Sequence, residues 1–226
     1  MQTEKVIDYI VNWLKDYATK AGVKGFVIGV SGGVDSGVVS TLCAMTGLKV
    51  LALEMPIRQQ KDQASRALEH IDFLKNKFPN VEGFTVDLNE PFEALYKTFD
   101  VKDDEFPAEK LAFANTRSRL RMLTLYYYGQ INGLLVCGTG NKVEDFGIGF
   151  YTKYGDGGVD VSPIADLYKT EVYALARALD LPESIKNAIP TDGLWDVDRT
   201  DEQQIGATYP ELEKIQKEWG TKTESD

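Results

Sequence analysis

The sequence predicts an α/β fold, in which a doubly wound, mostly parallel sheet is flanked by helices. Short apolar stretches alternate along the chain with amphipathic stretches of helical period, as in repeated strand–helix units. The apolar stretches are continuous instead of alternating with polar residues, which is typical of parallel strands buried on both faces. Glycine-rich turns follow the first and the fourth of these stretches, and doubly wound sheets bind ligands at such strand ends.

The expected elements cover most of the chain. Apolar residues at helical spacing indicate an opening helix, and they are Val6, Ile7, Ile10, Val11, Leu14 and Tyr17. Strands are expected in KGFVIGV, KVLALEMP, EGFTVDL and GLLVCGT, at residues 24–30, 49–56, 82–88 and 133–139. Further helices are expected at residues 37–45, 62–77, 91–99, 107–130, 167–179 and 210–218.

Two stretches and one helix face need separate comment. Residues 145–163 are rich in glycine and lack apolar periodicity, so they are interpreted as a long functional loop or lid. Residues 187–203 are interpreted as a second loop. In the helix at 62–77, the apolar face is expected to contain Ala64, Ala67, Leu68, Ile71 and Leu74. His70, the only histidine, is then placed on the polar side and given no role.

Composition limits the class of protein. A chain of 226 residues is long enough for one domain with a real core, so residues 1–226 are expected to form a single domain. The net charge of −10 and the absence of a dense basic run argue against a nucleic-acid partner. Cys43 and Cys137 lie in apolar context and are expected as buried thiols. No signal peptide or membrane-spanning run is visible, so a cytoplasmic protein without a membrane partner is expected.

The stretch FVIGVSGGVDSGVV, at residues 26–39, predicts a phosphate-binding turn between a strand and a helix. It lacks the lysine of a Walker loop and the glycine spacing of a dinucleotide-binding turn. Backbone amides and hydroxyls of Ser31, Gly32, Gly33 and Ser36 would face an anion at the helix N-terminus. A carboxylate such as Asp35 would repel phosphate unless it holds a cation, which indicates Mg²⁺. The structural alternative is an ordinary helix cap with glycines for a tight turn.

The hexapeptide SGGVDS resembles the S-G-G-x-D-S loop of the ATP pyrophosphatases, which bind the pyrophosphate that leaves when ATP becomes AMP. Three further stretches narrow the resemblance: NTRSRLRM at 115–122, GTGNKVEDFGIGFYTKYGDGGVDVSPIADLYKTEV at 138–172 and PTDGLW at 190–195. Together they resemble the ammonia-dependent NAD synthetases, a family with an adenine nucleotide alpha hydrolase-like fold. The stretch between Glu144 and Lys153 is one residue longer than the commonest family pattern, so the alignment of residues 145–148 is open.

The resemblance implies a role for each of a set of residues. Asp35, Lys153 and Lys169 are the candidate catalytic residues, and Asp35 and Glu144 are the candidate Mg²⁺ ligands. Arg119, Lys153 and Asp160 match positions that bind the dinucleotide substrate. Candidate ATP-binding residues are Gly29, Val30, Ser31, Gly32, Gly33, Val34, Asp35, Ser36, Thr139, Lys169 and Thr191. Met55 and Pro56, at the end of the second strand, are expected near the adenine.

The resemblance also implies a reaction, which is the amidation of nicotinic acid adenine dinucleotide by ammonia to give NAD. The implied route consumes ATP, uses Mg²⁺, passes through an adenylate and releases AMP and pyrophosphate. No glutamine amidohydrolase domain is expected, and family members form homodimers. Two alternatives stay open at this point. One is another ATP pyrophosphatase with a different acceptor, and the other is a non-catalytic nucleotide-binding protein.

Overall fold

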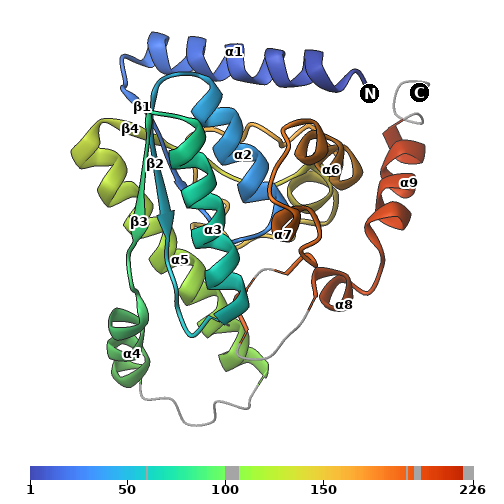
Figure 1. Ribbon diagram of the computed structural model, residues 1–226. Helices are drawn as coiled ribbons and strands as arrows, with labels where there is room; N and C mark the ends of the chain where they lie inside the picture. The colour runs from blue at the N-terminus through green and yellow to red at the C-terminus, as the bar shows by residue number, and fades with distance from the viewer. Residues whose placement is uncertain (60, 100–106, 192, 196–199, 221–226) are drawn as a thin grey trace.

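The computed structural model describes residues 1–59, 61–99, 107–191, 193–195 and 200–220. Its centre is a sheet of parallel strands in the order β3-β2-β1-β4 (Figure 1). The predicted parallel α/β architecture is therefore confirmed. The strands are β1 (Gly25–Gly29), β2 (Lys49–Glu54), β3 (Val81–Thr85) and β4 (Leu134–Val136).

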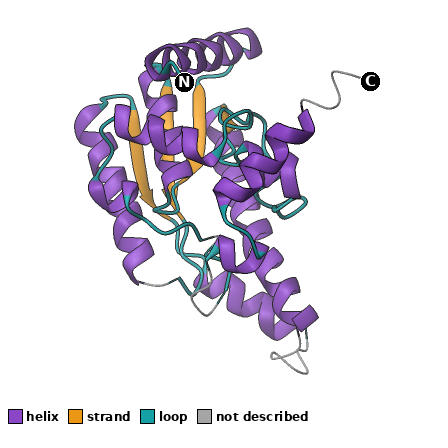
Figure 2. Cartoon of the chain, turned by 90° about the vertical axis from the view of Figure 1, so that its right-hand side faces the viewer, coloured by secondary structure: helices purple, strands orange, loops and turns teal. Residues whose placement is uncertain are grey.

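Helices connect and cover these strands, and Figure 2 shows the strands lying among them. In the described part of the chain, no helix is both long enough and apolar enough to cross a bilayer. The helices are α1 (Thr3–Ala21), α2 (Val34–Met45), α3 (Lys61–Lys77), α4 (Asn89–Thr98), α5 (Pro107–Asn132), a π-helix η1 (Val143–Ile148), α6 (Lys169–Ala178), α7 (Glu183–Lys186), α8 (Asp201–Ile205) and α9 (Tyr209–Gly220).

The sheet has an apolar core on each face because side chains alternate along every strand. In β1, Phe26 and Ile28 enter a large core with residues of α1, α2, α3 and α6. Val27 faces the opposite way, into a second core with residues of α4 and α5. All three side chains are fully buried. This two-sided burial explains why the strands have continuous apolar sequences.

The order of the strands places a topological switch point between β1 and β4. From β1 the chain proceeds outward through β2 to β3, and then returns to the other side of β1 as β4. Gly25 is in register with both Lys49 of β2 and Leu134 of β4. Loops that follow two such strands leave in opposite directions, and the crevice between them is the usual ligand site of open α/β sheets.

Two sequence-based expectations about the helices are wrong. His70 is completely buried, whereas Leu68 is 43% exposed, so the buried face of α3 is rotated from the expected one. The imidazole of His70 lies against α2, where its Nε2 is 2.9 Å from the Oγ of Ser40.

The expected opening helix is confirmed, with Ile7, Ile10 and Leu14 buried.

The two expected loops contain more regular structure than the sequence suggested. The glycine-rich stretch at 145–163 begins inside η1, and its end pairs with the sheet through the bridge between Cys137 and Val161. The second loop, 187–203, runs into α8, and its residues 192 and 196–199 lie outside the described part of the chain.

Candidate active site

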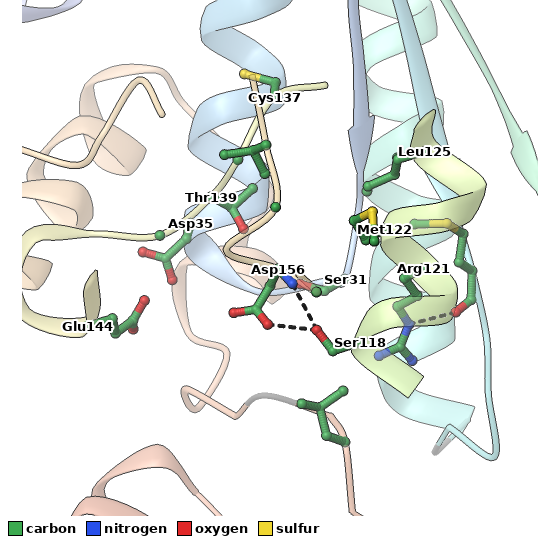
Figure 3. A pocket seen from close by; sticks show the side chains of 18 of the residues that line it. Ser31, Asp35, Ser118, Arg121, Met122, Leu125, Cys137, Thr139, Glu144 and Asp156 are labelled. Carbon is green, nitrogen blue, oxygen red and sulfur yellow. Dashed lines mark hydrogen bonds between the residues drawn. The ribbon is translucent and has the colours of Figure 1, made fainter. Parts of the chain in front are cut away.

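A cavity of about 230 Å³ opens at the carboxyl ends of the strands, at the switch point between β1 and β4 (Figure 3). Its walls come from segments that are far apart in the sequence. The predicted site residues among them are Gly29, Val30, Ser31, Asp35, Thr139, Glu144 and Thr191. Met55, which was expected near the adenine, also lines the cavity. The fold therefore brings together motifs that the sequence could only place on separate loops.

The glycine-rich turn after β1 has the geometry of an anion-binding loop. Gly32 adopts φ +83°, and a side chain there would also collide with the backbone carbonyl of Gln63, so glycine is required. Gly33 is the N-cap of α2 and offers no side-chain cap. The first amides of the helix, at Val34 and Asp35, are thus left for a ligand, and the helix dipole favours an anion there.

Ser36 fixes the shape of this turn through its hydroxyl. Its Oγ donates to the carbonyl of Gly33 at 3.0 Å and accepts from the amide of Ser31 at 3.2 Å. Ser31 Oγ lies 3.1 Å from Ser36 Oγ and 3.3 Å from the amide of Gly33. The two hydroxyl oxygens therefore accept from the backbone amides of Ser31 and Gly33, and the phosphate oxygens of a ligand would compete for these same donors.

Behind the turn, the Lys169 ammonium lies between two carboxylates. Lys169 Nζ is 2.5 Å from Asp35 Oδ2 and 3.1 Å from Glu144 Oε1. The lysine side chain is 3% exposed, and the carboxylates are 17% and 14% exposed. Asp35 lies in the first turn of α2, Glu144 belongs to η1 and Lys169 is the first residue of α6, so this cluster joins three elements. Asn141 Nδ2 holds the second oxygen of Asp35 at 3.2 Å.

Burial and charge act against each other in this cluster. Burial lowers the pKa of Lys169, but Asp35 and Glu144 together raise it by more, so the pKa is above its ordinary value and the ammonium stays charged. For Asp35, burial and the neighbouring Glu144 outweigh the attraction of Lys169, and the pKa is raised. A carboxylate with a raised pKa in a buried cluster marks a place where further positive charge would be stabilised.

Asp201 and Tyr209, which were assigned no role in the sequence analysis, complete the cluster from a distant part of the chain. Tyr209 Oη lies 2.7 Å from Glu144 Oε1 and 3.2 Å from Asp201 Oδ2. Both residues are at least 95% buried. Burial, together with Glu144 and Asp201, raises the pKa of the Tyr209 phenol, so it keeps its proton as a hydrogen-bond donor.

The cluster has the donor set of a divalent-cation site. Asp35 and Glu144 share the single ammonium of Lys169, so negative charge is in excess among these three groups. In the described residues, no hydrogen bond reaches Glu144 Oε2. Within the described residues, no three His, Cys, Asp or Glu side chains are placed to hold a metal ion together. Mg²⁺ is commonly held by one or two carboxylates together with substrate phosphates, and Asp35 and Glu144 fit that pattern.

The glycine-rich stretch that follows η1 is anchored to α5. Ser118 Oγ donates to Asp156 Oδ1 at 2.6 Å and accepts from the Asp156 amide at 2.9 Å, as drawn in Figure 3. Thr152 Oγ1 donates to Asn115 Oδ1 at 2.7 Å. A side chain on Gly155 would collide with Ser118, so the close approach requires glycine. This wall of the cavity is therefore held in place through side chains of α5.

The three predicted substrate-binding residues lie outside the lining of the cavity. Arg119 and Lys153 are neighbours, because Arg119 Nε donates to the carbonyl of Lys153 at 3.2 Å. Asp160 is bonded within the protein, accepting from the Val136 amide at 2.8 Å and from the Tyr126 hydroxyl at 3.0 Å. Their proposed contacts with the substrate remain predictions.

Several cavity residues were not identified from the sequence. Arg121 lines the cavity, and its guanidinium bonds the carbonyl of Met55 at 3.0 Å and Gln59 Oε1 at 3.3 Å. Its place in NTRSRLRM was the available signal, since that motif sets it one turn from Arg117. Asp145 also lines the cavity, where burial and then Glu144 raise its pKa to about 6. The two cysteines are buried thiols as expected.

Comparisons with known proteins agree with this geometry. The family model described as NAD synthase matches residues 6–226. The NH(3)-dependent NAD(+) synthetase of Mesoplasma florum is 41% identical over 214 residues, which are 94% of this chain and 84% of that protein. The corresponding protein of Finegoldia magna is 39% identical with the same coverage.

Solved structures of NMN and NAD synthetases also superpose on this chain. The structure of NMN synthetase from Francisella tularensis superposes with a TM-score of 0.87 at 35% identity, covering 96% of this chain and 87% of that one. The NH3-dependent NAD synthetase of Campylobacter jejuni, solved with a nitrate ion, has a TM-score of 0.78 at 29% identity. The superposition covers all of this chain and 86% of that one.

Proposed function

The chain belongs to the NAD synthase family, and we propose that it uses ATP and ammonia to amidate nicotinic acid adenine dinucleotide, giving NAD. The observation that carries the proposal is the meeting of Asp35, Glu144 and Lys169 beside the SGGVDS turn. These groups come from three separate motifs and converge where an open α/β sheet binds its ligand. A ligase that joins a carboxylate to ammonia at the expense of ATP must bring the carboxylate close to the ATP phosphates. It therefore needs positive charge, such as that of Lys169, to offset the repulsion between the two anions.

The first step of the proposed reaction is adenylation. The nicotinate carboxylate attacks the α-phosphorus of ATP, the bond to the bridging oxygen breaks, and pyrophosphate leaves. The amides of Val34 and Asp35 and the hydroxyls of Ser31 and Ser36 would bind the departing phosphates. Lys169 would supply positive charge to them from its buried position, so that two anions can approach each other.

Mg²⁺, held by Asp35 and Glu144, would add further positive charge at the phosphates when bound. Asn141 orients Asp35 for this role by donating to its Oδ1. Thr139 and Thr191 line the same cavity and would contact ATP.

In the second step, ammonia attacks the carbonyl carbon of the adenylate, and AMP leaves with the carboxylate oxygen that it acquired. No nucleophilic side chain is needed for either step. Arg119, Lys153 and Asp160 would hold the dinucleotide. The pairing of Arg119 with the backbone at Lys153 supports a shared site for these two cations. Anchoring of Asp156 to Ser118 supports a wall that keeps water from the adenylate.

A second acceptor is favoured by one observation. The Francisella tularensis protein whose structure superposes with a TM-score of 0.87 at 35% identity is an NMN synthetase. The same adenylation and amidation would then act on nicotinic acid mononucleotide. Both acceptors carry the same nicotinate carboxylate, so the cluster around Lys169 would serve either reaction.

A homodimer is also part of the proposal. On α5, Leu123, Tyr127 and Ile131 are each at least 60% exposed and follow one another at intervals of four residues. They form one apolar stripe along the helix. A second copy of the chain would bury this stripe. Two buried thiols, Cys43 and Cys137, support a reducing compartment, which we take to be the cytoplasm.

The test is a product assay with both acceptors. The purified protein is incubated with ATP, Mg²⁺, ammonium and either the dinucleotide or the mononucleotide, and the amide product and AMP are quantified together. We expect equal amounts of NAD and AMP from the dinucleotide, and neither from an Asp35→Ala variant prepared in parallel. Faster turnover of the mononucleotide would establish the second acceptor. AMP formation without either amide would contradict both.

A further inference from the structure

Tyr209 lies at the start of α9, more than 170 residues from the turn that it helps to complete. Its side chain is buried and contacts two members of the charged cluster at once. The hydroxyl lies 2.7 Å from Glu144 Oε1, and the ring centre lies 4.8 Å from Lys169 Nζ. Tyr209 itself lies outside the motifs by which the family was identified.

We propose that Tyr209 is a positioning residue, which holds the Glu144 carboxylate and the Lys169 ammonium in the arrangement that the reaction uses. The hydroxyl acts on the carboxylate and the ring acts on the ammonium. A phenol hydroxyl has one hydrogen, and the shorter of its two carboxylate distances is the one to Glu144. Glu144 is therefore fixed through Oε1, and its Oε2 is left without a hydrogen bond in the described part of the chain.

The ring of Tyr209 restricts the lysine. A lysine side chain has four rotatable bonds and a compact charge, so two carboxylates alone do not define its position well. The aromatic face attracts the ammonium and excludes water from that side of the cluster. Lys169 is consequently enclosed by Asp35, Glu144 and the Tyr209 ring, which agrees with its 2% exposure.

The rest of α9 supports the same two elements. Glu213, which is 3% exposed, accepts from the Thr170 amide at 2.9 Å and from the Thr170 hydroxyl at 2.8 Å. This carboxylate caps the first turn of α6 directly beside Lys169. On the other side, Gln216 Nε2 lies 3.4 Å from the carbonyl of Lys142, just before η1. Helix α9 thus contacts both the element that carries Glu144 and the element that carries Lys169.

The proposal predicts that removal of the Tyr209 hydroxyl alone lowers the rate of the reaction. Tyr209→Phe keeps the ring over the ammonium and removes only the hydroxyl, so Glu144 Oε1 loses a donor and the carboxylate can rotate. Hydrogen bonds of this kind to metal-ligating groups change metal affinity or activity by about 10-fold to 100-fold. We expect kcat to fall by about 10-fold, with a KM for ATP within about 2-fold of the wild-type value.

The control is Tyr173→Phe. Tyr173 is a half-buried tyrosine of α6 whose hydroxyl lies 3.4 Å from the carbonyl of Ala188 and, in the described part of the chain, forms no hydrogen bond with a carboxylate. Its kcat and KM are expected to match the wild type. Circular dichroism and urea unfolding establish that both variants are folded before any rates are compared.

The second readout does not require catalysis. Mn²⁺ is titrated into each protein in the presence of α,β-methylene ATP, and free Mn²⁺ is followed by electron paramagnetic resonance. We expect Tyr209→Phe to weaken Mn²⁺ binding by about 10-fold and Tyr173→Phe to leave it unchanged. The kinetic readout rests on the proposed function, whereas this titration does not. A wild-type protein that binds Mn²⁺ but forms no amide would overturn the function and leave the positioning role standing.

A double variant decides whether Tyr209 acts through Glu144. The loss from Tyr209→Phe is measured again in a Glu144→Ala background, at enzyme concentrations high enough to detect residual AMP formation. We expect a change of less than about 2-fold there, because the atom that the hydroxyl positions is absent. The same 10-fold loss in both backgrounds would overturn the proposal. A Tyr209→Phe protein that equals Tyr173→Phe in both kcat and Mn²⁺ binding would overturn it as well.

Discussion

Lys169 and Asp35 are 134 residues apart in the sequence, yet the ammonium of one lies 2.5 Å from a carboxylate oxygen of the other. The contact joins the first residue of α6 to the first turn of α2 at the carboxyl edge of the sheet. It places a permanent positive charge directly behind the turn that is proposed to bind phosphate. Because Glu144 shares the same ammonium, removal of Lys169 would leave two buried carboxylates facing each other.

Lys169→Met tests this relationship. We expect the free energy of unfolding at neutral pH to fall by about 3 kcal/mol, as is usual when one partner of a buried ion pair is removed. AMP formation should be lost in the same variant. Lys75→Met is the matched control, because Lys75 pairs with Asp72 at 3.7 Å and both side chains are exposed, and exposed pairs contribute little. Urea unfolding measures both proteins, and equal stability of the two variants would contradict this account of Lys169.

His70 predicts a defined dependence of stability on pH. Burial lowers its pKa to about 4 from an ordinary value of 6.5. Between these values the unfolded chain binds more protons than the folded protein, so stability is complete above about pH 6.5 and falls as the pH decreases toward 4. From about pH 7.5 to about pH 5, this group should cost about 2 kcal/mol of the free energy of unfolding.

The measurement compares the wild type with His70→Gln by urea unfolding at both pH values. The carboxyl of Asp145, whose pKa is raised to about 6, titrates in the same range and acts in the opposite direction. It is present in both proteins, so its contribution cancels in the difference between them. A difference that does not change with pH would show that His70 is not buried in its neutral form.

The contact between Ser118 and Asp156 predicts that its loss exposes the adenylate to hydrolysis. Ser118→Ala removes both hydrogen bonds between α5 and Asp156, so the glycine-rich wall of the cavity should admit water to the adenylate. We expect AMP to exceed the amide product by about 2-fold or more. Thr116→Ala is the control, because within the described residues its hydroxyl bonds the carbonyl of Ala112 in its own helix and reaches no other segment. A ratio of one AMP to one amide in Ser118→Ala would contradict a sealing role for this contact.

The apolar stripe on α5 predicts an interface between two copies. Leu123 is 61% exposed in the isolated chain. Leu123→Glu would bury a charge in a dimer at a large cost, and it would leave an isolated chain unaffected. Light scattering with size-exclusion chromatography should report a dimer for the wild type and a monomer for the variant. A wild-type monomer would contradict the dimer, and so would a dimer that tolerates the glutamate.

The sequence was informative wherever local pattern decides structure. Apolar runs located all four strands, and SGGVDS located the turn before α2, because the first depends on burial and the second on backbone geometry that only glycine permits at Gly32. The cluster partners Asp35, Glu144 and Lys169 were named through the family resemblance. Their convergence became visible only in the structure, because it depends on the strand order.

The failures have a common cause in long-range packing. His70 was placed on the polar side of α3 because histidine is polar, yet Ser40 of α2 provides a partner that allows its burial. Tyr209 and Asp201 lie in helices whose local sequences give no sign of the distant Glu144. Residues 145–148, which belong to the π-helix over Val143–Ile148, were assigned to a loop because the stretch lacks the apolar period of an α-helix.

The central claim is that this site joins the nicotinate carboxylate to the α-phosphorus of ATP. The direct measurement uses nicotinic acid adenine dinucleotide labelled with ¹⁸O in its carboxylate, in a reaction with ATP, Mg²⁺ and ammonium, followed by mass spectrometry of the products. The account predicts that each AMP carries one ¹⁸O atom and that pyrophosphate carries none. AMP without the label, formed together with NAD, would contradict the adenylate route.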